Sequence, residues 1–129
     1  PEPPAVMDAY TLLKAAAMDK ETPLGRVGLV VNMVSHRRDG PQVHERLQAT
    51  AERFLGVRID LLGHVFCDGH VGRAVQKQQP LALAYPHSQA AWCLKRVSGA
   101  LLDGSEGPSR PPRGKFLRRL ANLFGGTGR

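Results

Sequence analysis

Apolar residues in the first third of the chain first recur at helical spacing and then form a nearly unbroken run. Residues 5–18 place apolar side chains three or four positions apart, which predicts an amphipathic helix. A break at Thr22-Pro23-Leu24-Gly25 follows, and residues 27–34 are apolar at almost every position. Such a run is typical of a strand that is buried on both faces of a parallel sheet.

The next segment repeats this order of helix and strand. Asp39-Gly40-Pro41 predicts a turn, and residues 42–55 carry apolar side chains at helical intervals with charged ones between them. Gly56 is a suitable stop for that helix, because glycine adopts the left-handed conformation that ends many helices. Residues 59–67 form a second apolar run and predict a second strand.

Two more helices complete the pattern. One is predicted over residues 70–78 and ends before Pro80, and the other over residues 89–102, where Ser88 can cap its first turn. Alternation of helices and strands predicts an α/β fold with a partial, doubly wound parallel sheet. We assign residues 1–102 to this domain.

The charge of the chain is unevenly distributed. The formal net charge is +7, but the 109 residues before Arg110 hold 12 basic and 11 acidic residues. From Arg110 onward there are six basic residues and no acidic one. An anionic partner is therefore expected to meet the terminal segment rather than the body of the domain. Residues 103–114, rich in glycine, proline, serine and arginine, predict a flexible linker.

Cysteine and histidine positions suggest no metal centre. Cys67 and Cys93 are 26 positions apart, neither has a second ligand at metal-binding spacing, and the five histidines are scattered. We expect a reduced, cytosolic chain with no metal site. No apolar run approaches the roughly 20 residues of a membrane-spanning helix, and the first residue is Pro1, so this end is expected to be a cut or processed one.

Polar residues mark the ends of both predicted strands. Asn32 lies near the end of the first strand and Asp68 directly after the second. In doubly wound folds ligands bind beyond the carboxyl ends of the strands, and a carboxamide can both donate to and accept from an adenine edge. A strand-end polar residue for Asn32 and a helix N-cap for Asp68 are the simpler alternatives.

Several segments in order resemble the second half of the FlhG/FleN-type, MinD-like ATPases. The resemblance covers about residues 1–102 and rests on the order and spacing of the pieces. They are Pro1-Glu2-Pro3, Asp8-Ala9-Tyr10, Val30-Val31-Asn32-Met33, the segments 52–57 and 62–68, and Arg73 through Pro80.

The resemblance implies the carboxyl-terminal half of a P-loop NTPase fold and an ATP-dependent homodimer that controls flagellar number and placement. Asn32 would contact adenine, and Phe66, Cys67 and Asp68 would line the base pocket. Partners would be a second copy, an anionic membrane surface and a flagellar or polar regulatory protein, with the protein cytoplasmic and peripheral at the inner face of the membrane. The chain departs from the family where Phe66-Cys67 replaces a Pro-Tyr pair and where Gly69 stands in place of a common acid.

The residues for phosphoryl transfer are missing from this sequence. ATP and Mg²⁺ require a phosphate-binding loop and carboxylate or hydroxyl groups that hold the metal, and no Gly-x-x-x-x-Gly-Lys-Ser/Thr motif is present. We expect no catalytic residue in this chain and no ATP hydrolysis by the chain alone. The resemblance assigns those parts to the other half of the protein.

Residues 115–124 predict an amphipathic membrane-binding helix. In an α-helix each residue is rotated by about 100° about the axis. The large apolar side chains of this segment then fall within one arc of the helix and the basic ones on the opposite side. A helix that docks on the domain is the alternative. The membrane-binding residues are Lys115, Phe116, Leu117, Arg118, Arg119, Leu120, Leu123 and Phe124.

Two other classes of protein remain open. One is a non-enzymatic, membrane-associated adaptor that lacks the nucleotide site. The other is a nucleic-acid binder that uses the arginine-rich tail. Because large apolar residues are interleaved with the tail's charges, direct nucleic-acid binding is not expected.

Overall fold

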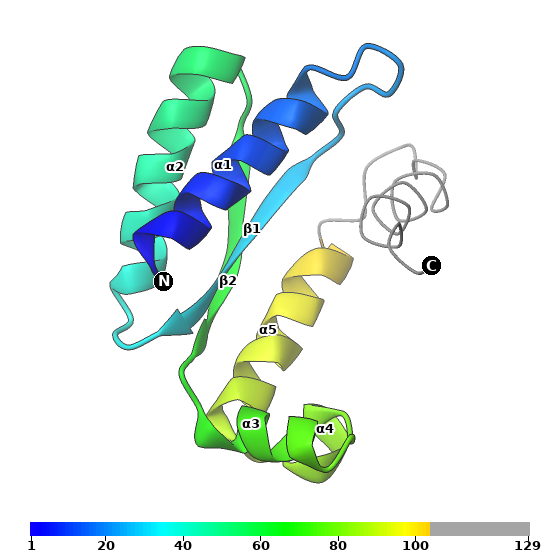
Figure 1. The fold of residues 1–129 in the computed structure, drawn as a ribbon. Coiled ribbons are helices and arrows are strands. Elements are labelled where there is room, and N and C mark those ends of the chain that lie inside the picture. Colours follow the sequence, from blue (N-terminus) through cyan, green and yellow to red (C-terminus); the bar gives the residue numbers. More distant parts are fainter. Residues whose placement is uncertain (104–129) are drawn as a thin grey trace, which may run out of the picture.

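The computed structural model describes residues 1–103, which form helices on two parallel strands (Figure 1). It is a mixed α/β arrangement with a small parallel sheet, consistent with part of a P-loop NTPase-like fold. The elements are α1 (Pro3–Ala17), β1 (Val27–Val34), α2 (Asp39–Leu55), β2 (Ile59–Phe66), α3 (Gly69–Gln76), α4 (Leu81–Ala84) and α5 (Gln89–Asp103).

The two strands confirm the parallel pairing that the apolar runs predicted. β1 has the expected bounds, and β2 ends one residue earlier than expected, at Phe66. The ladder begins with Val27 opposite Ile59 and ends with Val34 opposite Phe66. The connection between the strands runs through α2, as parallel strands require a crossover segment.

An extra residue in β2 turns its two halves toward different helices. Leu29 is opposite Leu61 but Val30 is opposite Gly63, so Leu62 is bulged out of the ladder. Ile59 therefore packs toward α1 and α2, whereas Val65, an even number of residues later, packs toward α5. Without the bulge these two side chains would lie on the same face of the sheet.

Two apolar clusters hold the helices on the sheet. The first joins Leu13 of α1, Leu47 and Ala51 of α2, and Ile59 of β2. The second is smaller and joins Val65 of β2 to the α5 residues Ala90 and Cys93. Figure 1 shows the corresponding layers, with α1 and α2 on one side of the strands and α5 on the other.

β1 is less buried than its sequence predicted. In this eight-residue strand only Val31 and Val34 are buried, while Val30 is 36% and Met33 63% exposed. The expectation of burial on both faces is wrong for the described residues. The physical reason is that, within residues 1–103, β1 pairs with β2 alone and α5 packs mainly against β2.

Several helix boundaries differ from the predicted ones. Asp39-Gly40-Pro41 is not a separate turn but the first turn of α2, where proline costs little because the amides there have no partner within the helix. α1 begins at Pro3 rather than at residue 5, because prolines in its first turn also cost little. Gly56 ends α2 with φ 64°, as expected.

The region between α3 and α5 holds a helix that the sequence did not predict. α3 ends at Gln76, two residues early, and Gln78 has a positive φ of 53°. Pro80 is then the N-cap of the short α4. Helices of a single turn leave too few apolar positions for a periodic pattern to be recognised.

The tail lies outside the described residues. The predicted linker, residues 103–114, is outside them except for Asp103, the last residue of α5. The predicted membrane helix, residues 115–124, is outside them entirely. Among residues 1–103, no helix is both long and apolar enough to cross a membrane.

The approach of α5 to β2 generates a stability prediction at Gly63. A Cβ at this position would lie 3.0 Å from Cγ2 of Val97, and the backbone has φ 152°. We expect Gly63→Ala to lower the free energy of unfolding by about 1–3 kcal/mol, because both the packing and the backbone are strained.

The matched control is Gly72→Ala, within α3, where a Cβ would meet nothing within 4 Å. This change should leave stability equal or slightly higher, since alanine favours the helix. Chemical denaturation measures both variants. Equal stability of Gly63→Ala and the parent chain would contradict the close packing of α5 on β2.

Candidate functional site

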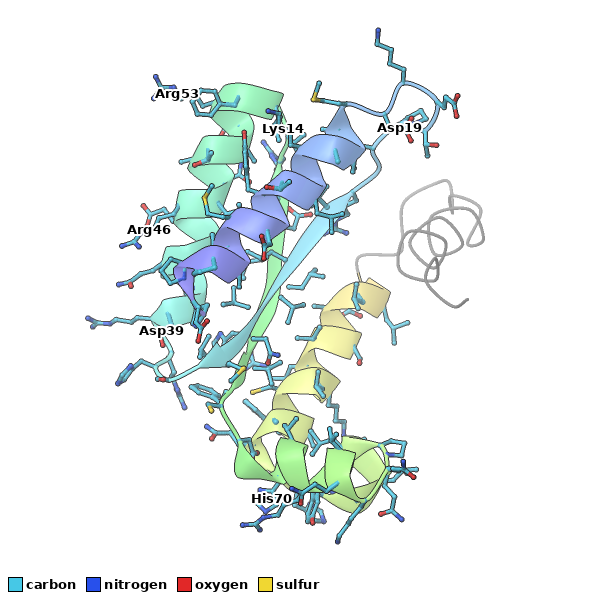
Figure 2. All side chains as sticks on the ribbon, in the orientation of Figure 1. Lys14, Asp19, Asp39, Arg46, Arg53 and His70 are labelled. Carbon is cyan, nitrogen blue, oxygen red and sulfur yellow. The ribbon has the colours of Figure 1, made fainter. Side chains whose placement is uncertain are left out.

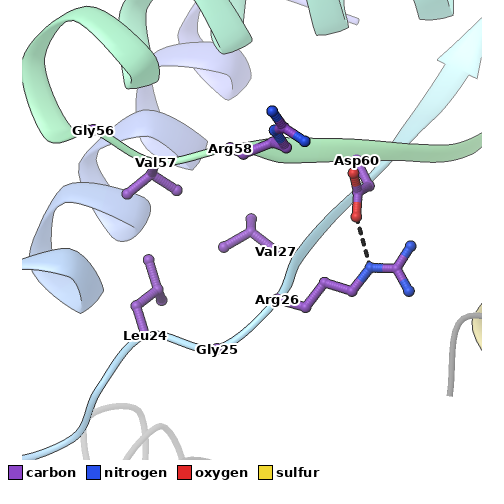
Figure 3. Close-up of a pocket in the computed structure, with 8 residues that line it drawn as sticks. All are labelled: Leu24, Gly25, Arg26, Val27, Gly56, Val57, Arg58 and Asp60. Carbon is purple, nitrogen blue, oxygen red and sulfur yellow. Dashed lines mark hydrogen bonds and ion pairs between the residues drawn. The ribbon is translucent and has the colours of Figure 1, made fainter. Parts of the chain in front are cut away.

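Two hollows lie at opposite ends of the parallel strands. The smaller, about 310 Å³, is at the amino ends, between the segment before β1 and the one before β2 (Figure 3). Its ion pair joins Arg26 Nε to Asp60 Oδ2 at 2.6 Å, but both side chains are more than a third exposed, so water screens the attraction. Ligands of parallel α/β folds bind at the other edge of the sheet, which makes this hollow the weaker candidate.

The larger hollow, about 670 Å³, borders the carboxyl half of β1, and we call it the β1 groove. One wall comes from the first turns of α1, the floor from β1, and the far end from α2 and the residue after β2. Its volume is in the range of pockets that hold small molecules. The lining residues are Pro1, Glu2, Ala5, Val6, Ala9, Leu29, Val30, Val31, Asn32, Met33, Ser35, Val43, Leu47 and Cys67.

A second bulge places Asn32 at this groove. Val31 is opposite His64 and Val34 opposite Phe66, so Asn32 and Met33 together face a single residue of β2. Met33 has φ 57°, a conformation that costs a bulky residue roughly 1–3 kcal/mol. The Asn32 Oδ1 accepts a hydrogen bond from the Met33 amide at 2.9 Å and stabilises the bend. Bulges of this kind often redirect a side chain next to a binding site.

Of the four predicted base-pocket residues, the structure brings Asn32 and Cys67 together. Cys67 is exposed and lines the groove, and its amide donates to the Val34 carbonyl at 3.0 Å, which extends the strand pairing by one step. Phe66 does not line the groove. It packs against the cluster under α5, with its ring centroid 5.0 Å from that of His64.

Asp68 does not line the groove either. Its side chain is only 6% exposed, and its Oδ1 accepts from the backbone amide of His70 at 2.9 Å, so it is the N-cap of α3. Its Oδ2 accepts from the backbone amide of Ala90, in the first turn of α5, at 3.0 Å. The Ala90 bond, followed by those from His70, lowers the pKa of Asp68 to about 2, so the carboxylate is ionised at neutral pH.

The loop after β1 is held by a second carboxylate. Asp39 Oδ2 accepts from the amides of Ser35 and His36 at 2.9 and 2.8 Å, and these bonds, the one from His36 first, lower the pKa of Asp39. Figure 2 shows Asp39 at the start of α2, beside the end of β1, and His70 on α3 below the sheet. Ser35 is thereby fixed at the mouth of the β1 groove.

The chemistry of the groove fits a nucleotide base better than a phosphate chain. The walls are mainly apolar, and Asn32 offers a carboxamide, the group that matches the paired donor and acceptor of adenine. Among residues 1–103, no lysine or arginine lines the groove, and the one carboxylate that does, that of Glu2, would repel phosphates. Mg²⁺ would find a single carboxylate here, too few for a protein-held site.

Sequence reasoning missed the wall that α1 contributes. Pro1, Glu2 and Ala5 line the groove because α1 crosses β1 and packs on α2. No local pattern marks such residues, since their role depends on contacts with segments about 30 residues away. The bulge at Asn32 and Met33 likewise has no signal in an apolar run.

Comparison with known proteins relates the chain to two bacterial proteins. It is 31% identical over 122 residues to Antiactivator FleN of Pseudomonas aeruginosa, covering 92% of this chain and 42% of that protein. It is 25% identical over 130 residues to the Flagellum site-determining protein YlxH of Helicobacter pylori, covering 97% and 43%.

No family model matches the chain. The chain spans less than half the length of either relative, although nearly all of it is aligned. This pattern agrees with the ordered set of segments that the sequence carries. The chain is thus FlhG/FleN-like, and it fits a carboxyl-terminal fragment of a protein of that family.

Proposed function

We propose that this chain supplies the base-recognising side of an adenine nucleotide site and the membrane-binding tail of a regulator of flagellar number and placement. The observation that carries the first part is the meeting of Asn32 and Cys67 at the β1 groove, at the carboxyl edge of the parallel strands. Adenine would lie against the apolar walls and bond to the Asn32 carboxamide.

Phosphates and Mg²⁺ would be held elsewhere in the complete protein. A phosphate-binding loop and bound Mg²⁺ supply the electrostatic stabilisation that ATP hydrolysis needs. This chain would orient the base and exclude water from one side of it. The isolated chain would therefore bind ATP weakly and turn over none.

The exposed side of β1 supports a larger, doubly wound sheet in the complete protein. β1 pairs with β2 along one edge, and the apolar residues Val30 and Met33 are exposed. Unpaired strand edges favour association with another strand. A strand from the other half of the protein would pair with the free edge of β1.

The printed names of the two relatives, an antiactivator and a flagellum site-determining protein, support a role in the regulation of flagella. We propose that ATP binding drives dimerisation and that the dimer carries two tails. Two weak membrane contacts on one particle bind far more strongly than one, by effective concentration. Nucleotide state would thereby control residence at the inner face of the membrane and access to a flagellar or polar partner.

The tail is amphipathic by sequence. Burial of its five large apolar side chains contributes on the order of 8–10 kcal/mol before the cost of ordering the helix, which is of similar size. Attraction of its basic residues to anionic lipid adds about 1 kcal/mol each. One tail should bind weakly and reversibly.

The nucleotide site is tested with Asn32→Ala in a protein in which this chain is joined to the missing half. We expect ATP affinity to fall by about 1–3 kcal/mol, because the base loses its hydrogen-bonding partner. Thr11→Ala is the matched control, since Thr11 is an exposed polar residue of α1 that does not line the groove. Titration calorimetry measures both, and equal affinity of Asn32→Ala and the parent would remove Asn32 from the site.

The membrane tail is tested by liposome sedimentation of the full chain. We expect binding to vesicles with anionic lipid, less binding at high salt, and loss of binding when Leu120 and Phe124 are both changed to Glu. Changing Arg118 and Arg119 to Ala should weaken binding by only about 2 kcal/mol at low salt.

This ranking separates membrane from nucleic-acid binding. A nucleic-acid tail would depend on the arginine pair and be nearly insensitive to Leu120 and Phe124. Neutral vesicles provide the lipid control. Undiminished binding of the double Glu variant to anionic vesicles would disprove the membrane helix.

A further inference from the structure

One carboxylate links the groove end of β2 to the starts of two helices. Oδ1 of Asp68 accepts from the His70 amide and also lies 2.8 Å from His70 Nδ1, while Oδ2 accepts from the Ala90 amide, 22 residues along the chain. An ordinary N-cap satisfies only the amides of its own helix. Asp68 does this for α3 and in addition holds the first turn of α5.

The environment favours a fixed, ionised side chain. The amino ends of α3 and α5 both direct at the carboxylate their positive dipole ends and amides that have no partner within the helix, which stabilises its charge. Burial to 6% exposure leaves it little freedom to exchange these partners for water. Charge-assisted hydrogen bonds of this kind are roughly twice as strong as neutral ones.

Asp68 is the direct neighbour of Cys67, which lines the groove. The Cys67 amide bonds to the Val34 carbonyl, just beyond the bulge that carries Asn32. A displacement of Asp68 would therefore move the Cys67 backbone relative to β1. The position of α5 is fixed, because α5 packs along β2 through Ala90, Cys93 and Val97.

We propose that Asp68 is a positioning residue of the β1 groove, whose carboxylate fixes Cys67 beside Asn32 by holding the first turns of α3 and α5. Asp68 itself does not touch the ligand. This role concerns the shape of the groove. Its biological use alone rests on the proposed base site.

The test compares Asp68→Asn and Asp68→Ser with Ser88→Ala. Asparagine keeps the size but loses one acceptor oxygen, and serine can still cap α3 but is too short to reach Ala90. Ser88 accepts from the Ala91 amide at 3.2 Å, so Ser88→Ala removes an acceptor from the same helix start without touching Cys67. Circular dichroism establishes that each variant is folded.

Two readouts report the groove without any nucleotide, so failure of the base site would leave them unaffected. They are the labelling rate of Cys67 by a small disulfide reagent, with buried Cys93 as the internal reference, and the NMR positions of the Asn32 side-chain amide and the Cys67 amide. We expect both Asp68 variants to change the Cys67 rate severalfold and to shift these signals. Ser88→Ala should leave them as in the parent, even where it lowers the melting temperature.

Three results would overturn the proposal. The first is an unchanged Cys67 rate and unchanged signals in folded Asp68→Asn and Asp68→Ser. The second is an equal response to Ser88→Ala, which would reduce Asp68 to a general stabiliser of α5. The third is complete unfolding of both Asp68 variants while Ser88→Ala stays folded, since the carboxylate would then hold the core rather than the groove.

Discussion

The parallel pairing of β1 with β2 is the interaction on which the rest of the structure depends. It is the link between the cluster under α1 and α2 and the cluster under α5, because Ile59 belongs to one and Val65 to the other. The bulge at Leu62 makes this possible by reversing the direction of the side chains midway along β2. Two short strands can thus support helices on both of their faces.

The second irregularity of the same ladder gives the carboxyl edge its chemistry. At Asn32 and Met33 the ladder bends, and it resumes with Val34 and Cys67. Positive φ at an exposed, bulky Met33 is unfavourable in itself, so the surrounding contacts must hold it. The Asn32 side chain supplies one of them, and on the β2 side the buried carboxylate of Asp68 secures the adjacent backbone.

The sequence predicted the elements well because long apolar runs and Gly56 carry local signals. It also indicated both possible roles of Asp68, and the N-cap is the one that the hydrogen bonds support. It could not predict that Cys67 lines the groove while Phe66 and Asp68 do not, since this depends on where β2 ends. Nor could it predict the groove wall formed by Pro1 and Ala5, which arises from packing between distant segments.

The central claim, that Asn32 and Cys67 share one groove, is tested most directly by attaching a nitroxide to Cys67 and recording the NMR signals of side-chain amides. The reference is Gln48, whose side chain accepts from the Ile59 amide at the opposite end of β2. The account predicts strong broadening of the Asn32 signal and a much sharper Gln48 signal. An Asn32 signal as sharp as that of Gln48 would contradict it.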